Sequence, residues 1–296
     1  MADFGRLITA MVTPFDESGE VDYPQARKLA LALLDSGSDG LVVSGTTGES
    51  PTLGRNEKLR LFAEVKTAVG DRGTVLAGTG SNNTKESITL SKAAEETGVD
   101  GCLLVVPYYN KPTQEGLFAH FTSIASATRL PCILYNVPSR TITSLSLETV
   151  VRLSEVGNIV GIKEASGNLD HVTKIMQNTP STFLVYSGND GDTLPMLALG
   201  AYGVISVASH LVGNQIKDMI EKFLGGDTAE AAAIHRHLLG LISALFIVSN
   251  PIPVKHVLNH LGFRVGKPRL PLIQPDEQSA SRIISAVNSY SIDLPM

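Results

Sequence analysis

Short apolar segments alternate with longer amphipathic segments along the chain as far as Leu224. The short segments are rich in β-branched residues and are bounded by Gly, Pro or Asp. They are continuously apolar, a pattern typical of strands that are covered on both faces. The eight predicted strands are Leu7–Val12, Gly40–Val43, Thr74–Ala77, Gly101–Val106, Cys132–Tyr135, Ile159–Lys163, Phe183–Ser187 and Gly203–Val207.

A helical pattern follows each of these strands. In Arg55–Val69, for example, Leu59, Phe62 and Val65 recur at helical spacing. Eight βα units without hairpin signals predict a parallel sheet that closes into a (β/α)8 TIM barrel, and the alternative is an open doubly wound sheet. The predicted helices are Tyr23–Ser36, Arg55–Val69, Thr84–Thr97, Gln114–Ala127, Ser146–Ser154, Asn168–Met176, Gly191–Leu199 and His210–Leu224.

The alternation stops after Leu224, and the rest of the chain shows only helical patterns. We therefore divide the chain into a catalytic barrel, residues 1–224, and a C-terminal helical subdomain, residues 225–296. Helices are predicted in this appendage at Thr228–Val248, Pro253–Leu261 and Pro275–Ser289.

Composition narrows the class of protein. The chain has 43% hydrophobic and 18% charged residues, which is ordinary for a globular protein. The net charge of −5, with both signs interspersed, argues against nucleic acid or a membrane surface as the main partner. The longest apolar stretch, Leu238–Val248, is too short to span a bilayer. Neither a secretory signal nor a disulfide framework is visible, so we expect a cytoplasmic protein.

Polar side chains follow the strands of the predicted barrel, where barrel proteins place their active sites. Lys163 ends an otherwise apolar strand. If it faces the barrel mouth, desolvation lowers its pKa and frees the amine to attack a carbonyl, which is Schiff-base chemistry. A lysine that extends to solvent is the alternative. From spacing alone, both interpretations stay open.

Three other residues fit the same site. Tyr135 ends the preceding strand, from which its phenol could move protons with help from a hydroxyl such as Thr46, unless it is an ordinary interior aromatic. Arg140 lies in a turn after that strand and suits carboxylate recognition, unless it is a solvated loop residue.

His256 and His260 stand four residues apart without a metal-binding pattern, so no metal site is expected.

Taken together, six motifs resemble the dihydrodipicolinate synthase family, within the pyruvate-dependent class I aldolases that include N-acetylneuraminate lyase. The resemblance covers nearly the whole chain. The motifs are Gly45-Thr46-Thr47-Gly48-Glu49-Ser50, Pro107-Tyr108-Tyr109-Asn110-Lys111-Pro112, Leu134-Tyr135-Asn136-Val137-Pro138-Ser139-Arg140-Thr141, Gly161-Ile162-Lys163-Glu164-Ala165, Ser187-Gly188-Asn189-Asp190 and Gly203-Val204-Ile205-Ser206.

The resemblance implies a lyase that condenses pyruvate with L-aspartate 4-semialdehyde to 4-hydroxy-tetrahydrodipicolinate, on the route to diaminopimelate and lysine. It implies an imine between Lys163 and pyruvate, with no metal or organic cofactor. Thr46, Tyr135 and Tyr109 would relay protons, with Tyr109 reaching the site of a partner subunit. The remaining implied contacts are Thr47, Gly188 and the Ile205 backbone for pyruvate, and Arg140 for the carboxylate of the semialdehyde.

Two other functions stay open. A sugar-acid aldolase of the N-acetylneuraminate lyase type would use the same imine, but the lyases that resemble this chain lack the arginine found here at position 140. A non-catalytic keto-acid sensor could keep the scaffold without its chemistry. The presence of Lys163, Tyr135 and Arg140 favours the synthase.

The resemblance also concerns regulation and assembly. It implies a homotetramer built as a dimer of dimers. Some family members are inhibited by lysine in a cleft at the dimer interface. Arg55 and Lys58 replace the histidines of some sensitive members, and two cations repel a cationic ligand, so we expect weak or absent inhibition. The positions that match the cleft are Ser50, Arg55, Lys58, Asn82, Glu86 and Tyr108.

Overall fold

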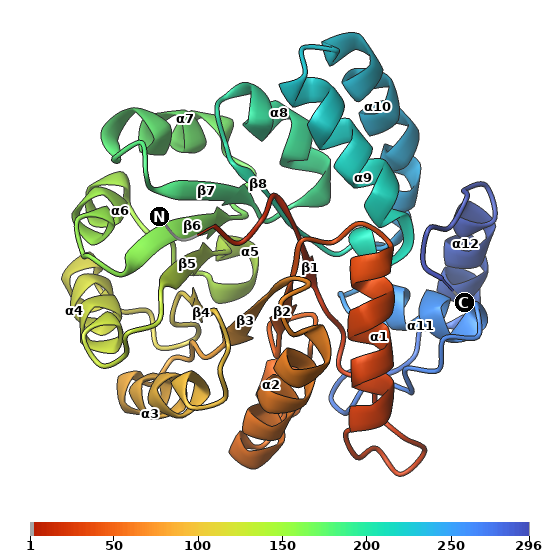
Figure 1. The fold of residues 1–296 in the computed structure, drawn as a ribbon, viewed down its shortest axis with the longest axis horizontal. Helices are drawn as coiled ribbons and strands as arrows, with labels where there is room; N and C mark the ends of the chain where they lie inside the picture. Colours follow the sequence, from red (N-terminus) through yellow and green to blue (C-terminus); the bar gives the residue numbers. More distant parts are fainter. Residues whose placement is uncertain (1–2, 296) are drawn as a thin grey trace.

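The computed structural model describes residues 3–295 and contains a closed barrel of eight parallel strands, shown in Figure 1. Each strand pairs with its neighbours in sequence, and β1 closes the barrel against β8. The predicted strands are confirmed to within two residues at each end. They are β1 (Leu7–Ala10), β2 (Gly40–Val43), β3 (Thr74–Gly78), β4 (Gly101–Val105), β5 (Cys132–Asn136), β6 (Ile159–Glu164), β7 (Leu184–Ser187) and β8 (Gly203–Ser206).

A ring of helices surrounds the barrel. Asp22, Asn83, Thr113 and Asn168 precede four of them, and each side chain accepts a hydrogen bond from the backbone amide three residues on, as an N-cap does. The ring helices are α1 (Tyr23–Asp35), α2 (Arg55–Val69), α3 (Thr84–Glu95), α4 (Gln114–Ala125), α6 (Leu147–Ser154), α7 (Leu169–Asn178), α8 (Thr193–Ala198) and α9 (Ser209–Leu224).

Short helical turns are added at the carboxyl ends of three strands. Helix α5 (Pro138–Thr141) forms where the sequence predicts a turn, and the 3-10 turn η1 (Ser50–Thr52) lies where no helix is predicted. The 3-10 turn η2 (Asp190–Asp192) takes the place of the first turn of the predicted Gly191–Leu199 helix. Segments of three or four residues are too short to show helical periodicity. These turns matter because α5 carries Arg140 and η2 begins at Asp190.

The C-terminal appendage consists of α10 (Thr228–Ala244), α11 (Ile252–His260) and α12 (Glu277–Val287), which gather on one side of the barrel beside α1 and α9 (Figure 1). The predicted boundary at residue 224 coincides with the end of α9, and the division into two domains stays a prediction. Helix α10 ends four residues before the predicted Val248. From there, residues 245–251 lead to the barrel mouth.

Apolar side chains fill the barrel from the amino ends of the strands upward. Ile8, Leu76, Ile133 and Tyr186 belong to one buried cluster inside the barrel. The Tyr186 hydroxyl donates to the carbonyl of Gly5, 3.0 Å away. The cavity that holds Lys163 is therefore at the carboxyl ends of the strands. Among residues 3–295, no helix has both the length and the apolar character needed to cross a membrane.

Candidate active site

Lys163 is buried at the carboxyl end of β6. Its side chain faces the barrel mouth, yet only 5% of the residue is exposed. Burial lowers its pKa to about 8, with a smaller upward contribution from Asp190 and a smaller downward one from Arg140. An amine with this pKa is neutral in roughly one molecule in ten at pH 7, far more often than an exposed lysine. The alternative that Lys163 extends to solvent is thus wrong.

Tyr135 lies directly beside Lys163. The two residues are register partners on β5 and β6, and the Lys163 Nζ atom is 4.5 Å from the centre of the phenol ring. Burial raises the pKa of Tyr135, while Arg140 and a hydrogen bond with Thr46 oppose the increase. The phenol therefore stays protonated at neutral pH, and it can donate a proton to a group that forms on Lys163.

Thr46 and Thr47 lie in the loop after β2. Thr47 is buried and accepts a hydrogen bond from Asn250 Nδ2 at 2.9 Å. The Asn250 carbonyl accepts from Arg140 Nη2 at 3.4 Å. Asn250 thus connects the loop after β2 with the loop after β5, a contact that the sequence analysis did not predict.

A buried ion pair holds the loop after β2, in which Glu49 lies. Lys255 Nζ on α11 lies 2.8 Å from Glu49 Oε1, and both side chains are almost fully buried. The Lys255 ammonium also donates to the carbonyls of Thr13 and Lys267. The backbone amide of Arg269 donates to Glu49 Oε2. The helical appendage therefore fixes the loop that carries Thr46 and Thr47.

Asp190 supplies a negative charge near Lys163. Its carboxylate accepts hydrogen bonds from the Ser206 hydroxyl and from the backbone amides of Val207 and Ala208. Burial raises the pKa of Asp190, and these bonds and the charge of Lys163 oppose the increase. Asp190 ends the Ser187-Gly188-Asn189-Asp190 motif, and the sequence alone assigns it no role.

A cavity of about 140 Å³, here called the inner cavity, contains this chemistry. Gly188 lines it, and a Cβ atom there would lie 2.6 Å from Ala165 Cβ and 3.1 Å from Lys163 Cε. Ile205 has its side chain buried in the barrel. Phe246, which no sequence pattern singles out, also lines the cavity with an apolar ring. The residues that line the inner cavity include Thr46, Thr47, Tyr135, Arg140, Lys163, Gly188, Phe246 and Asn250.

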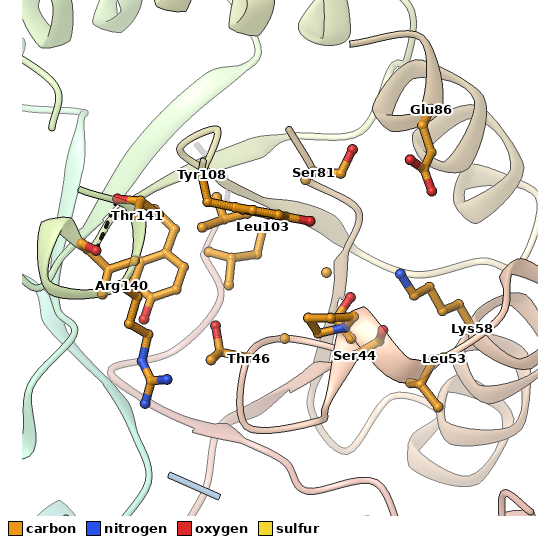
Figure 2. A pocket seen from close by; sticks show the side chains of 18 residues that line it. Ser44, Thr46, Leu53, Lys58, Ser81, Glu86, Leu103, Tyr108, Arg140 and Thr141 are labelled. Carbon is orange, nitrogen blue, oxygen red and sulfur yellow. Dashed lines mark hydrogen bonds between the residues drawn. The ribbon is translucent and has the colours of Figure 1, made fainter. Parts of the chain in front are cut away.

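A second cavity of about 350 Å³, here called the long cavity, shares Thr46, Tyr135 and Arg140 with the inner cavity. Figure 2 shows Arg140 at one end and Lys58 with Glu86 at the other. Burial lowers the pKa of Lys58, and Glu86 opposes the decrease.

The structure brings most residues of the predicted lysine cleft to one place. Ser50, Lys58, Glu86 and Tyr108 line the long cavity. Asn82 donates a hydrogen bond to the Tyr108 carbonyl, 3.1 Å away. Arg55 lies beside Lys58 and Glu86 in an adjoining hollow.

Tyr109 is the one predicted relay residue that lines neither cavity. It is 90% exposed, and its backbone has a φ of 74°, which is unusual for a residue other than glycine. Within one chain it does not join Thr46 and Tyr135.

The fold and site define a (β/α)8-barrel protein with a solvent-shielded lysine at its mouth. The Dihydrodipicolinate synthetase family model matches residues 3–289, and the chain belongs to this family. The resemblance noted from the motifs is confirmed.

Curated relatives and solved structures agree with this assignment. A 4-hydroxy-tetrahydrodipicolinate synthase of Dehalococcoides mccartyi (strain CBDB1) is 66% identical over the full length of both chains. One from Moorella thermoacetica is 55% identical over 98% of this chain and 99% of the relative.

Dihydrodipicolinate synthase DapA-2 of Bacillus anthracis has a TM-score of 0.96 at 49% identity, covering 98% of this chain and 99% of that one. The Cyanidioschyzon merolae enzyme, solved with lysine bound, has a TM-score of 0.95 at 48% identity, covering 97% and 98%.

Proposed function

We propose that the chain is a lyase, a 4-hydroxy-tetrahydrodipicolinate synthase that condenses pyruvate with L-aspartate 4-semialdehyde. The observation that carries this proposal is the buried Lys163 amine, with its lowered pKa, beside the Tyr135 phenol. Full-length relatives at 66% identity with this activity support it. The reaction belongs to diaminopimelate and lysine synthesis, for which we propose a cytoplasmic location.

The reaction begins at Lys163. The neutral amine attacks the ketone carbon of pyruvate, and the resulting carbinolamine loses water to give a protonated imine. Tyr135 supplies a proton to the departing hydroxyl, and Thr46 is its hydrogen-bonded neighbour. Loss of a methyl proton converts the imine into an enamine. No metal or organic cofactor is needed, because the imine itself accepts the electron pair.

The enamine then forms a carbon–carbon bond with the aldehyde carbon of the semialdehyde, and the new alkoxide takes a proton. Attack by the substrate's own amine on the imine carbon closes the ring and releases Lys163. One water leaves overall. We assign the carboxylate of the semialdehyde to Arg140, whose guanidinium lines the inner cavity.

The loops at the carboxyl ends of the strands bind pyruvate. We assign its carboxylate to the Thr46–Thr47 loop, with Gly188 and the Ile205 backbone beside it. The Arg140 guanidinium at the inner cavity favours an acceptor that carries a carboxylate over a polyhydroxylated one without it. Arg140 thus supports the synthase over the sugar-acid aldolase, and the Lys163 amine beside the Tyr135 phenol supports it over a non-catalytic keto-acid sensor.

We further propose that Tyr109 completes the proton relay in a partner subunit, within a homotetramer built as a dimer of dimers. An aromatic ring that is 90% exposed on a strained backbone supports this role, since an interface would cover it.

The test is reductive trapping. Incubation with pyruvate and borohydride should add a pyruvate-derived group to Lys163, identified by peptide mass. K163R keeps the charge but should give no adduct. A coupled assay with aspartate semialdehyde, against N-acetylmannosamine as competing acceptor, then identifies the second substrate. Absence of an adduct in folded wild-type protein would contradict the proposed function.

A further inference from the structure

A polar network lies on the outer face of β5 and β6, behind the active site. Successive residues of a strand point to opposite faces of the sheet. Tyr135 and Lys163 face the cavity, so the residues after them, Asn136 and Glu164, face the surrounding helices. These two are also register partners. The inner pair therefore has an outer pair directly behind it.

The outer pair is joined by its side chains. Asn136 Nδ2 lies 3.2 Å and 2.9 Å from the two carboxylate oxygens of Glu164 and donates to them. The Ser166 amide donates to Glu164 Oε1 at 2.7 Å, and His171 Nε2 on α7 lies 3.9 Å from Oε2. Asn136 and Glu164 are each at most 2% exposed. The Glu164 carboxylate is thus held by the donors of Asn136 and Ser166, because leaving either donor or the carboxylate unpaired is costly.

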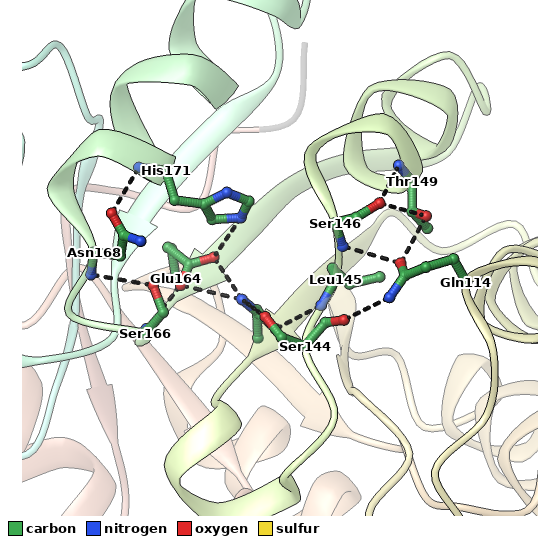
Figure 3. Close-up of polar contacts among 10 residues, drawn as sticks. Gln114, Ser144, Leu145, Ser146, Thr149, Glu164, Ser166, Asn168 and His171 are labelled. Carbon is green, nitrogen blue, oxygen red and sulfur yellow. Dashed lines mark hydrogen bonds and ion pairs between the residues drawn. The ribbon is translucent and has the colours of Figure 1, made fainter.

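The pair also holds the segment after α5, which contains Ser144 and Leu145 (Figure 3). The Leu145 backbone amide donates to Asn136 Oδ1 at 3.1 Å. The Ser144 hydroxyl lies 3.3 Å from both Oδ1 and Nδ2 of the Asn136 side chain. From the other side, Gln114 on α4 donates to the Ser144 carbonyl at 2.9 Å. The segment from α5, which carries Arg140, to Leu145 is here called the Arg140 loop, and its end is thus fixed between α4 and the outer pair.

We propose that Asn136 and Glu164 are positioning residues that set Lys163 against Tyr135 and anchor the Arg140 loop for imine formation. The inference rests on the proposed function. The pair does not touch the substrate, because it lies on the other face of the strands. It acts through the backbone of adjacent residues, and a displacement of about 1 Å at a reacting group can cost roughly a hundredfold in rate.

The test uses E164Q, which keeps the shape of the side chain but turns one acceptor into a donor. A donor then faces either the Asn136 amide or the Ser166 amide. We expect the rate constant of imine formation at saturating pyruvate to fall by roughly 10- to 100-fold. The half-saturating pyruvate concentration should change little, because the Thr46–Thr47 loop, to which we assign the pyruvate carboxylate, follows a different strand, β2.

The reciprocal variant N136D/E164Q should restore the rate. In it, the introduced glutamine donates to the introduced aspartate, while the carbonyl oxygen of the glutamine accepts from Ser166. N136D alone sets two carboxylates against each other and should be at least as slow as E164Q. E95Q is the control: Glu95, at the far end of α3, also accepts from a side chain and a backbone amide, here the Thr128 hydroxyl and the Arg129 amide, and it pairs with the Arg129 guanidinium as well.

The rate is measured by quenching with borohydride at timed intervals, with folding checked by circular dichroism. No adduct in the wild type would contradict the proposed function itself. A wild-type rate in folded E164Q would overturn the positioning role alone. So would a folded double variant as slow as E164Q, or the loss of folded protein in all three variants. If E164Q alone fails to fold, recovery of the wild-type rate in the double variant supports the proposal.

Discussion

Tyr135 and Lys163 lie side by side on adjacent parallel strands, with the amine 4.5 Å from the centre of the phenol ring. Parallel register places both at the same height above the barrel interior. The proton donor is therefore held next to the nucleophile by the backbone pairing of β5 and β6. Chemistry at this site depends on protonation of the amine and on the space around it.

The pH dependence of imine formation should follow the pKa of Lys163. Because that pKa is lowered to about 8, the trapping rate should rise with pH and level off above about pH 8. The sign for stability is the same: the unfolded chain, with an ordinary lysine, binds more protons between the two pKa values, so burial costs less stability as pH rises through this window. Timed borohydride trapping across pH measures the midpoint.

Charges beside the lysine should move this midpoint in opposite directions. Asp190 raises the pKa of Lys163, and Arg140 lowers it. D190N should therefore shift the midpoint down, while R140Q should shift it up. Because the asparagine introduced by D190N keeps one oxygen acceptor for the amides of Val207 and Ala208, the variant should still fold. Shifts of the same sign in both variants would refute the electrostatic assignment.

Gly188 should be required for its small size. In G188A the new Cβ would approach Ala165 Cβ to 2.6 Å and Lys163 Cε to 3.1 Å, so the lysine must shift. Imine formation should slow by at least about tenfold. G191A is the matched control, because its Cβ would meet only Leu239 Cδ1, at 3.7 Å. Equal rates in the two variants would argue against this crowding.

Removing Lys255 should destabilise the barrel. In K255M the Glu49 carboxylate stays buried without its cation, which costs about 3–5 kcal/mol of unfolding free energy. E49Q/K255M should recover part of that loss. Thermal unfolding measures both, with the exposed pair of Arg152 and Glu115 as a control whose loss should change little. A K255M protein as stable as the wild type would show that the pair does not hold the loop.

Lysine should inhibit weakly or not at all. Arg55 and Lys58 place two cations beside the predicted cleft, and Glu86 offsets only part of that charge. K58H should therefore increase inhibition, with K85H, also in this hollow but outside the predicted contacts, as its control. Activity is measured over a lysine titration. Half-inhibition of the wild type below about 1 mM would contradict the prediction.

Much of the barrel could be predicted because its strands are buried on both faces, so their sequences are uniformly apolar and easily bounded. The short turns could not. Helix α5 has four residues, and the end of α10 is hidden because apolar residues continue through Phe246 and Ile247. That segment leaves the helix near the mouth, where Asn250 contacts Thr47.

The sequence by itself determined which groups stand at the mouth, since parallel strands all end on one face of a barrel and Lys163, Tyr135 and Gly188 follow directly from strand ends. Only the tertiary structure decided that Lys163 is shielded from water, because burial is a property of all surrounding chains together. It also decided that Asn250 and Lys255 complete the Thr46–Thr47 loop. These contacts join residues more than two hundred positions apart, a separation that no local pattern records.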